Sequence, residues 1–559
     1  MFFGFIAKLL SLVFERRVVR RHIFKVCAKT GVYTLVAVPI LFASSLNAAR
    51  LQYEGKWRAT SPEMEITGFV SLDIKKLDNG FQVTLMDPGQ EPDVPMYTIT
   101  AKEVDGKLVG RFRAVFSYFD LNKFLTKNVD MTAQLNADSG ALDVNLKDAA
   151  GVEVNLEFYS SNDARFLKFD AARLNANGEV VSNYQYVPPV KTKNGFPVST
   201  LKDENISQKR VEEALNAVMK GEVVERPAFV LVAANGKLVL EEYFHGTDRE
   251  KLWLQYSVTK SITSLLTGIA QDNGEIDVNE PINSYFPDYR SSVWMTSKAG
   301  KAGVTPKTLL SMGNVIGWDE RAIGENYISY GNMIYHEDGW VDYIFGQPVI
   351  THKPGPYLNY NTLMTNVAGM TLERATGKHL SDYVQTELLT PIGETRSYFD
   401  SYAAIYGASA NEEWPALGGS TVMMRPLAMA KIGQLVLNRG RWQGKQIISA
   451  DWIEESTSVQ ALTFEISEFG YGYSWWIRKL LSSGDDDVWC IWARGLGNQN
   501  IVIIPAYNLV VAVGAIDFGS SAFLWTPWFE KTLLPALTIG EPFESQKLGA
   551  EDLGAVTVK

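Results

Sequence analysis

The segment SVTKSITSLLTGI, residues 257–269, decides how the second half of this chain folds. Four apolar side chains recur in it with the helical period: Ile262, Leu265, Leu266 and Ile269. This spacing predicts a helix with one buried face. Ser257 and Lys260 lie about one turn apart on a shared side of that helix. The pattern therefore places a hydroxyl and an amine within reach of each other.

This pairing of serine with lysine suits nucleophilic catalysis. A serine hydroxyl attacks poorly until another group takes its proton, and a lysine can take it only after losing its own. Burial near other cationic or polar groups lowers the pKa of a lysine. The first turn of a helix adds backbone N–H groups and a partial positive charge, which stabilise an oxyanion.

The tetrapeptide Ser-x-x-Lys is a weak signal by itself. A chain of this length contains roughly one or two such matches by chance. Ser199-Thr200-Leu201-Lys202 is a second match, but no apolar periodicity follows it. We interpret that second match as part of a linker, so the assignment at Ser257 needs support from the rest of the chain.

The composition is that of a globular protein with more than one domain. The chain has 559 residues, of which 46% are hydrophobic and 21% are charged, and this length exceeds one ordinary core. The net charge of -10 gives no reason to expect a nucleic-acid partner. Cys27 lies close to a targeting segment and far from Cys490, which argues against a structural disulfide. The five histidines form no Cys/His cluster, so we expect no metal and no cofactor.

The first 49 residues have the order of an export signal. Basic residues within 16–29 precede an apolar run at about 32–43 and a small, polar stretch at 44–49. The sequence RRHIFK at 20–25 also looks like a twin-arginine signal, an alternative to the general secretory route. The apolar run is short for a membrane span, which favours cleavage. We expect an exported, periplasmic protein, with a membrane anchor through residues 1–45 as the alternative.

Residues 50–190 are expected to form an all-β domain. Apolar residues alternate there with polar ones, as in Phe81, Val83 and Leu85, and turn signals such as Asp105-Gly106 separate the runs. This pattern favours a small sandwich or a curled barrel. It contains no catalytic constellation, so its role is unassigned.

Residues 206–540 have a different pattern. Strand pairs are expected near both ends, at about 229–244 and 501–514, with helices and loops between them. This order predicts an α+β domain in which an antiparallel sheet, closed by both termini, is flanked by helices and carries a helical insertion. The chain then divides into a signal or anchor (1–49), the all-β domain (50–190), a linker (191–205), this domain (206–540) and a C-terminal tail (541–559).

Two further motifs follow Ser257-x-x-Lys260. Pro354-Gly355 precedes Tyr360-Asn361-Thr362, and the strand Ala493-Arg494-Gly495 lies ten residues before Pro505. In this order the motifs resemble the serine hydrolases of the class C β-lactamase and penicillin-binding group, over about residues 206–540. Within that group the sequence is most similar to the branch of esterases and aminohexanoate-oligomer (nylon-oligomer) hydrolases.

The resemblance implies a β-lactamase-like fold and a role for each matching residue. Ser257 would be the acylated nucleophile, and Lys260 with Tyr360 would act as general base and acid. The backbone N–H groups of Ser257 and Leu496 would form the oxyanion hole. Three residues are candidates for the substrate side of the site: Thr362, Arg494 and Gly495. Tyr357 competes with Tyr360, and Arg494 could instead face solvent.

Two departures from the family pattern bear on the substrate. Thr362 stands where β-lactamases of this group usually have asparagine, and Ala493 stands where the family has lysine or histidine. The second change removes the usual partner of a β-lactam carboxylate, so we expect a small-molecule ester or amide substrate. The alternatives are a D-alanyl peptidase or β-lactamase that acts on cell-wall-like substrates, and a non-catalytic binding protein with the same fold.

One aromatic stretch is open to two interpretations. Tyr471-Gly472-Tyr473-Ser474-Trp475-Trp476 contains four aromatic rings in six residues. We interpret it as a packed strand rather than a sugar-binding platform, although a cleft could use one of its rings.

Overall fold

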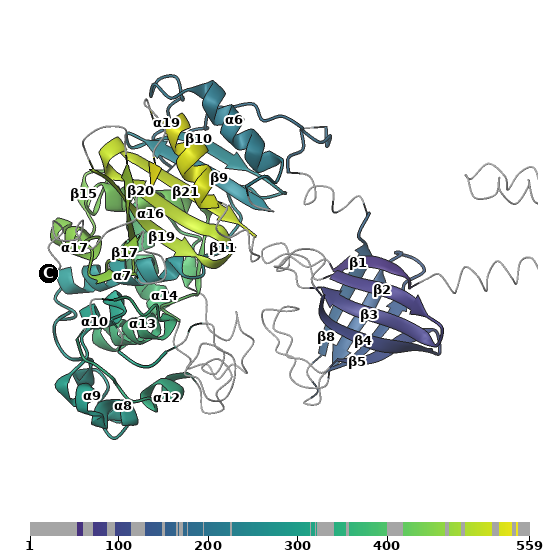
Figure 1. Cartoon of the computed structure of the whole chain (residues 1–559), viewed down its shortest axis with the longest axis horizontal. Coiled ribbons are helices and arrows are strands. Elements are labelled where there is room, and N and C mark those ends of the chain that lie inside the picture. Colours follow the sequence, from purple (N-terminus) through teal and green to yellow (C-terminus); the bar gives the residue numbers. More distant parts are fainter. Residues whose placement is uncertain are drawn as a thin grey trace, which may run out of the picture.

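The computed structural model consists of a small β-barrel and a larger unit in which helices surround a sheet (Figure 1). The predicted export signal at 1–49 lies outside the described residues. Among the residues that are described, no helix combines the length and apolar character needed to cross a membrane. The structure describes residues 53–59, 71–86, 95–112, 129–147, 151, 153–163, 166, 172–175, 177–193, 195–223, 226–313, 315–318, 320, 340–353, 357–399, 417–463, 469–481, 487–516, 525–538 and 544–545.

The N-terminal unit is a closed barrel in which each strand pairs antiparallel with the next and the last pairs with the first. Of the two predicted all-β architectures, the structure therefore has the barrel. Its strands are β1 (Gly55–Ala59), β2 (Ser71–Leu77), β3 (Gly80–Met86), β4 (Pro95–Val104), β5 (Lys107–Phe112), β6 (Val129–Leu135), β7 (Leu142–Lys147) and β8 (Glu153–Ser160).

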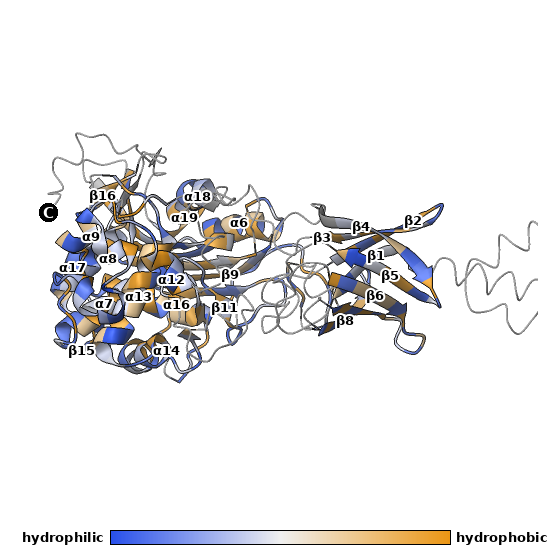
Figure 2. Ribbon diagram, turned by 90° about the horizontal axis from the view of Figure 1, so that it is seen from below, coloured by the Kyte–Doolittle hydropathy of each residue, from blue (hydrophilic) through white to orange (hydrophobic). Residues whose placement is uncertain are grey.

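Alternating side chains fill the barrel interior. In β3, Phe81, Val83 and Leu85 are buried and face inward, whereas Gln82 and Thr84 between them are partly exposed. The same alternation in the other strands gives an apolar core inside the barrel, and it is visible as alternating orange and blue along the barrel strands (Figure 2). The period-two prediction is confirmed for this unit, because every strand must present one face to a closed interior.

The larger unit is organised around an antiparallel sheet with strand order β10-β9-β21-β20-β19-β18-β17-β16, and β22 pairs with β18. The N-terminal hairpin of this unit, β9 and β10, therefore lies beside the C-terminal strand β21. Strands β9 and β21 are buried along their whole length, because helices cover both faces of the sheet. The strands are β9 (Pro227–Ala234), β10 (Lys237–Tyr243), β16 (Ala461–Leu462), β17 (Phe469–Tyr471), β18 (Trp476–Leu481), β19 (Asp487–Gly495), β20 (Gln499–Ile504), β21 (Leu509–Ala515) and β22 (Glu544–Ser545).

The two faces of the sheet carry separate apolar cores. One core includes α7 (Val258–Asp272) and α16 (Pro426–Leu437). The other includes α6 (Gln208–Met219) and the C-terminal segments α18 (Trp525–Trp528), η9 (Phe529–Leu533) and α19 (Leu534–Leu537). Alternate residues of β9 enter the two cores, so this strand joins them.

A largely helical region lies between α7 and α16. Its helices and short helical turns are η2 (Ile282–Ser284), η3 (Pro287–Tyr289), α8 (Val293–Thr296), α9 (Lys298–Ala302), α10 (Pro306–Ser311), α12 (Trp340–Phe345), α13 (Thr362–Thr376), α14 (Leu380–Tyr383), η4 (Val384–Leu389) and η5 (Thr390–Ile392). The remaining small elements are β11 (Trp253–Leu254), β12 (Tyr398–Phe399), β13 (Val422–Met424), β14 (Arg441–Trp442), β15 (Lys445–Gln446), α17 (Ala450–Ser456), η6 (Leu496–Asn498) and η7 (Pro505–Tyr507).

The segment that joins the two units lies against the larger one. Arg173 forms an ion pair of 2.6 Å with Glu242 on β10, and Tyr184 donates a hydrogen bond of 2.7 Å to the same carboxylate. Within the predicted linker 191–205, Val198 forms a parallel bridge with Leu238 on β10. The linker thus extends the edge of the sheet and covers its backbone groups.

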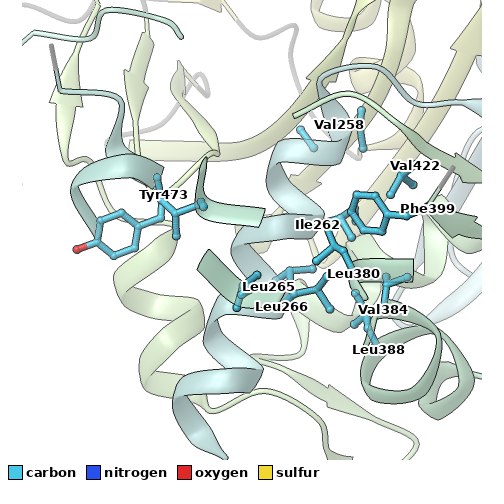
Figure 3. Close-up of a cluster of buried hydrophobic side chains, with 14 of the residues drawn as sticks. Val258, Ile262, Leu265, Leu266, Leu380, Val384, Leu388, Phe399, Val422 and Tyr473 are labelled. Carbon is cyan, nitrogen blue, oxygen red and sulfur yellow. The ribbon is translucent and has the colours of Figure 1, made fainter. Parts of the chain in front are cut away.

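Helix α7 is the centre of the larger unit, and it differs from the prediction in one respect. Every residue from Val258 to Ala270 is buried, so the helix is enclosed on all sides and the prediction of one buried face was wrong. The apolar side chains Ile262, Leu265 and Leu266 pack against Leu380 and its neighbours (Figure 3). Its hydroxyl side is also covered, because these hydroxyls bond to neighbouring backbone: Thr263 donates to Gly418 O at 2.6 Å.

A buried ion pair ties the C-terminal helical segment to the sheet. Arg478 on β18 and Glu530 on η9 have side chains that are 2% and 5% exposed and pair with each other. Taking two charges out of water is costly, and their attraction offsets that cost only while both are present. The pair therefore makes stability sensitive to the loss of either partner.

We predict that Glu530→Leu lowers the free energy of unfolding by about 3–5 kcal/mol, because Arg478 is left as an uncompensated buried charge. Urea unfolding followed by tryptophan fluorescence would measure this, since every tryptophan except Trp57 lies after residue 250. The control is Glu454→Leu, which breaks an exposed ion pair with Arg439 and should cost less than about 1 kcal/mol. Equal losses in the two variants would contradict the prediction.

Candidate active site

Ser257 and Lys260 meet at the start of helix α7. Ser257 is the N-cap residue of the helix, and the Lys260 Nζ donates to the Ser257 Oγ at 2.8 Å. The same Nζ donates at 2.8 Å to the backbone carbonyl of Gly419. Tyr256, immediately before the serine, has a left-handed backbone with φ of 44°, a conformation that costs energy for a residue with a side chain. The two predicted partners are therefore in direct contact.

The environment of Lys260 favours loss of its proton. Its side chain is 1% exposed, and burial lowers its pKa to about 8, with the charge of Glu320 opposing the shift. A buried ammonium is disfavoured because the surrounding protein solvates charge poorly. As the pH rises toward 8, a growing fraction of Lys260 is therefore neutral and can accept a proton from the serine beside it.

Tyr360 approaches the same pair from the segment before α13. The Lys260 Nζ lies 5.1 Å from the centre of its ring. Burial raises the pKa of Tyr360, and the charge of Glu320 adds to that shift, whereas the nearby Ser257 hydroxyl and the charge of Arg494 oppose it. Tyr360 is therefore a neutral phenol near pH 7 and can donate a proton. Tyr357, its competitor, has a side chain that is 42% exposed.

Aromatic rings from the sheet hold Tyr360 in place. Trp476, the first residue of β18, stacks on it with ring centroids 5.6 Å apart and an angle of 22° between the planes. Tyr471, the last residue of β17, meets it edge-on at 6.2 Å. The prediction that this stretch is one packed strand was wrong, because Tyr471 ends β17, Trp476 begins β18 and residues 472–475 form the turn between them. Two of its rings contact Tyr360.

The end of β19 lies next to the segment that leads into Ser257. A side chain on Gly495 would place its Cβ 2.3 Å from the backbone oxygen of Gln255, so only glycine allows this approach. Leu496 follows in η6, and its side chain is 57% exposed. Gly495 therefore permits contact between the end of β19 and the backbone at Gln255. Leu496 follows directly after the end of β19.

Arg494 and Ala493 occupy opposite sides of β19. Ala493 is buried in the core that contains α7. The guanidinium of Arg494 lies 4.8 Å from the ring centre of Trp492 and 5.8 Å from that of Trp476. Burial lowers the pKa of Arg494 to about 10. Arg494 is therefore half-buried against two indoles, and the solvent-facing alternative does not describe it.

Two residues that sequence reasoning missed, Glu320 and Gly419, accept hydrogen bonds from candidate site residues. Glu320 accepts hydrogen bonds from the backbone and the hydroxyl of Thr362, so the Thr362 hydroxyl is directed at a protein carboxylate. Gly419 supplies the carbonyl that accepts from Lys260, and a Cβ there would meet Asn366 Oδ1 at 2.8 Å. Two consecutive glycines, Gly418 and Gly419, could have predicted a close approach between backbone segments. Glu320 belongs to no motif with a defined spacing, so the sequence did not identify it.

The second Ser-x-x-Lys match forms no such pair. Ser199 donates its hydroxyl hydrogen to Glu204 at 2.7 Å, and Lys202 is exposed. Its interpretation as part of the linker agrees with this geometry.

The chain is similar to known proteins over its larger unit. The family model described as Beta-lactamase matches residues 215–522, more than half of the chain. The 6-aminohexanoate-dimer hydrolase of Paenarthrobacter ureafaciens is 24% identical over 298 residues, which cover 49% of this chain and 69% of that protein. Among solved structures, a candidate 6-aminohexanoate-dimer hydrolase from Bacillus anthracis has a TM-score of 0.45 and 17% identity, over 60% of this chain and 86% of that chain. A family VIII carboxylesterase has a TM-score of 0.42 and 18% identity, over 62% of this chain and 96% of that chain.

We predict that Gly495→Ala lowers the rate at which a fluorophosphonate modifies Ser257 by about a hundredfold, because displacement of the β19 end by about 1 Å spoils a reactive geometry. The labelling rates of the two proteins would be compared at a pH where the rate no longer rises with pH. Gly317→Ala is the control, since the nearest atom to an added Cβ there lies at 3.5 Å. A Gly495→Ala variant that is labelled as fast as the control would contradict the prediction.

Proposed function

The chain belongs to the beta-lactamase family of hydrolases, and from that premise we propose that it cleaves an ester or amide bond through an acyl-enzyme formed on Ser257. The contact of 2.8 Å between the Ser257 hydroxyl and the buried Lys260 amine carries this proposal. A nucleophile with a base of lowered pKa beside it is what acyl transfer requires.

In the first half-reaction, neutral Lys260 takes the proton of Ser257 while the Oγ attacks the substrate carbonyl carbon. The backbone N–H groups of Ser257 and Leu496 would stabilise the oxyanion, a role supported by the close approach of Gly495 to Gln255. The neutral Tyr360 phenol donates its proton to the leaving alcohol or amine as the carbonyl–heteroatom bond breaks. The phenolate then recovers a proton from the Lys260 ammonium, which leaves the pair neutral.

In the second half-reaction, water attacks the acyl-enzyme while the Lys260–Tyr360 pair takes a proton from it. The tetrahedral intermediate collapses with release of the acid, and Ser257 recovers its proton from the same pair. Lys260 and Tyr360 titrate as a coupled unit. The lowered pKa of Lys260 and the raised pKa of Tyr360 support the lysine as base and the tyrosine as acid in acylation.

The substrate we propose is a linear ester or amide rather than a β-lactam. The family places a cation at the first position of the third motif. In this chain that position is Ala493, which carries no charge and is buried in the core. Arg494, one residue on, lies against two indoles. One relative is named as a hydrolase of the 6-aminohexanoate dimer, and we propose a substrate of comparable kind, a linear amide or ester, for this chain. Export to the periplasm through residues 1–49 remains part of the proposal.

We predict that Ser257→Ala abolishes both turnover and fluorophosphonate labelling, because Ser257 is the one hydroxyl that bonds Lys260 among the residues described by the structure. The control is Ser264→Ala on the same helix, since the Ser264 hydroxyl is buried without a hydrogen-bond partner in the described part of the chain. Labelling of the Ser257→Ala protein would refute the assignment. A panel of p-nitrophenyl esters, linear amides and a chromogenic cephalosporin separates the alternatives: rapid turnover of the cephalosporin alone would favour the β-lactamase reading.

We predict that kcat/KM for a p-nitrophenyl ester rises with pH and levels off above pH 8. Lys260 is a base only when neutral, and its pKa is lowered to about 8, so activity is lost as the pH falls through that value. A pH profile between about 6 and 10 would measure the midpoint. Lys260→Gln should remove the rising limb together with most of the activity. A midpoint near 10 in the wild type would instead assign the limb to an ordinary lysine or to Tyr360.

A further inference from the structure

Glu320 accepts hydrogen bonds from two segments beside the active site. The Trp318 Nε1 donates to its Oε2 at 2.5 Å, and the Thr362 backbone N–H donates to the same oxygen at 3.1 Å. The Thr362 hydroxyl donates to Oε1. The carboxylate is half-buried, and both of its oxygens are therefore engaged by neighbouring groups of the protein.

These bonds fix the beginning of helix α13. Thr362 is the first residue of this 15-residue helix, and the side chain of Asn361 caps it by accepting from the Met364 N–H at 3.3 Å. A carboxylate at a helix N-terminus satisfies free N–H groups and is favoured by the helix dipole. Tyr360 comes directly before the cap, so the bonds to Glu320 fix the backbone two residues after Tyr360, while Trp476 and Tyr471 pack against its ring.

The charge of Glu320 also acts on the groups around Ser257. It raises the pKa of Lys260 on α7, of Tyr360 and of Tyr471 on β17. Arg494 on β19 acts on Tyr360 in the opposite direction. Tyr360 is thus subject to the opposing charges of one carboxylate and one guanidinium, and Lys260 to that of the carboxylate.

We propose that Glu320 is a positioning residue for the reaction: its carboxylate holds the first turn of α13, and with it Tyr360, and places a negative charge beside the Lys260–Tyr360 pair. This inference rests on the proposed function. Thr362, which the family resemblance places on the substrate side, serves in this arrangement to bind Glu320. The hydroxyl at that position is then a structural partner of the carboxylate.

The test is the pH dependence of fluorophosphonate labelling of Ser257 in the full chain and in Glu320→Gln. Glutamine keeps the size of the side chain but removes its charge and cannot accept all three hydrogen bonds. We expect the midpoint of the labelling rate to move to lower pH, because Lys260 loses the charge that favours its ammonium form. We also expect the plateau rate to fall by about tenfold, as for the loss of one hydrogen bond to a charged group.

Three further variants separate charge from structure. Glu320→Asp keeps the charge and should keep the wild-type midpoint even where its plateau falls. Thr362→Val removes one donor to the carboxylate and should lower the plateau without moving the midpoint. Glu213→Gln, on the exposed side of α6, removes an equal charge far from these contacts and should change neither value.

Two outcomes would overturn the inference. One is a Glu320→Gln midpoint at or above that of the wild type. The other is an equal shift of the midpoint in the Gln and Asp variants, which would mean that the charge of Glu320 is not what acts on the pair. Failure of the proposed function would give a different result. In that case the wild-type protein would not be labelled by the fluorophosphonate, or the Ser257→Ala variant would still be labelled.

Discussion

The larger unit depends on the complete burial of helix α7. A helix with hydroxyl groups along one side normally turns that side to water, but here every residue from Val258 to Ala270 is covered. Each buried hydroxyl left without a partner would cost about 1–3 kcal/mol. Most are satisfied by backbone groups of distant segments: Ser261 donates to Ser474 O and Thr263 to Gly418 O, both at 2.6 Å. Bonds of this kind set the position of the helix more narrowly than apolar packing would.

The same bonds bring the parts of the site together. Residues 418 and 419 lie so close to α13 that Gly418 would place a Cβ 2.5 Å from the Thr365 backbone oxygen. This contact brings the Gly419 carbonyl to Lys260, while the sheet contributes Gly495, which lies against Gln255 just before the nucleophile. The nucleophile thus lies where the sheet, α7 and the helical region meet. Its reactivity depends on three segments that are far apart in the sequence.

Local patterns predicted much of this arrangement. The alternation in β3 and the periodicity of α7 predicted the correct strand and helix, because both patterns depend only on residues that are close together in the sequence. The choice between sandwich and barrel was not available from sequence, since it depends on whether β1 pairs with β8 across the domain. The all-round burial of α7 was missed because its hydroxyls resemble a solvated face. Ser257, Lys260 and Tyr360 do come together, whereas Glu320 and the stacking of Trp476 on Tyr360 arise from tertiary contacts without a sequence period.

The pairing of β9 with β21 has a consequence for how the chain folds. The first hairpin of the larger unit needs a neighbour that is synthesised about 280 residues later. The barrel, by contrast, pairs each strand with the next one in sequence apart from its closing contact. During synthesis the barrel can therefore form early, whereas the edge of β9 stays unpaired until β21 has been made. An unpaired apolar edge binds chaperones and promotes self-association. The linker segment is bonded along the opposite edge of the hairpin, on β10, and does not cover β9.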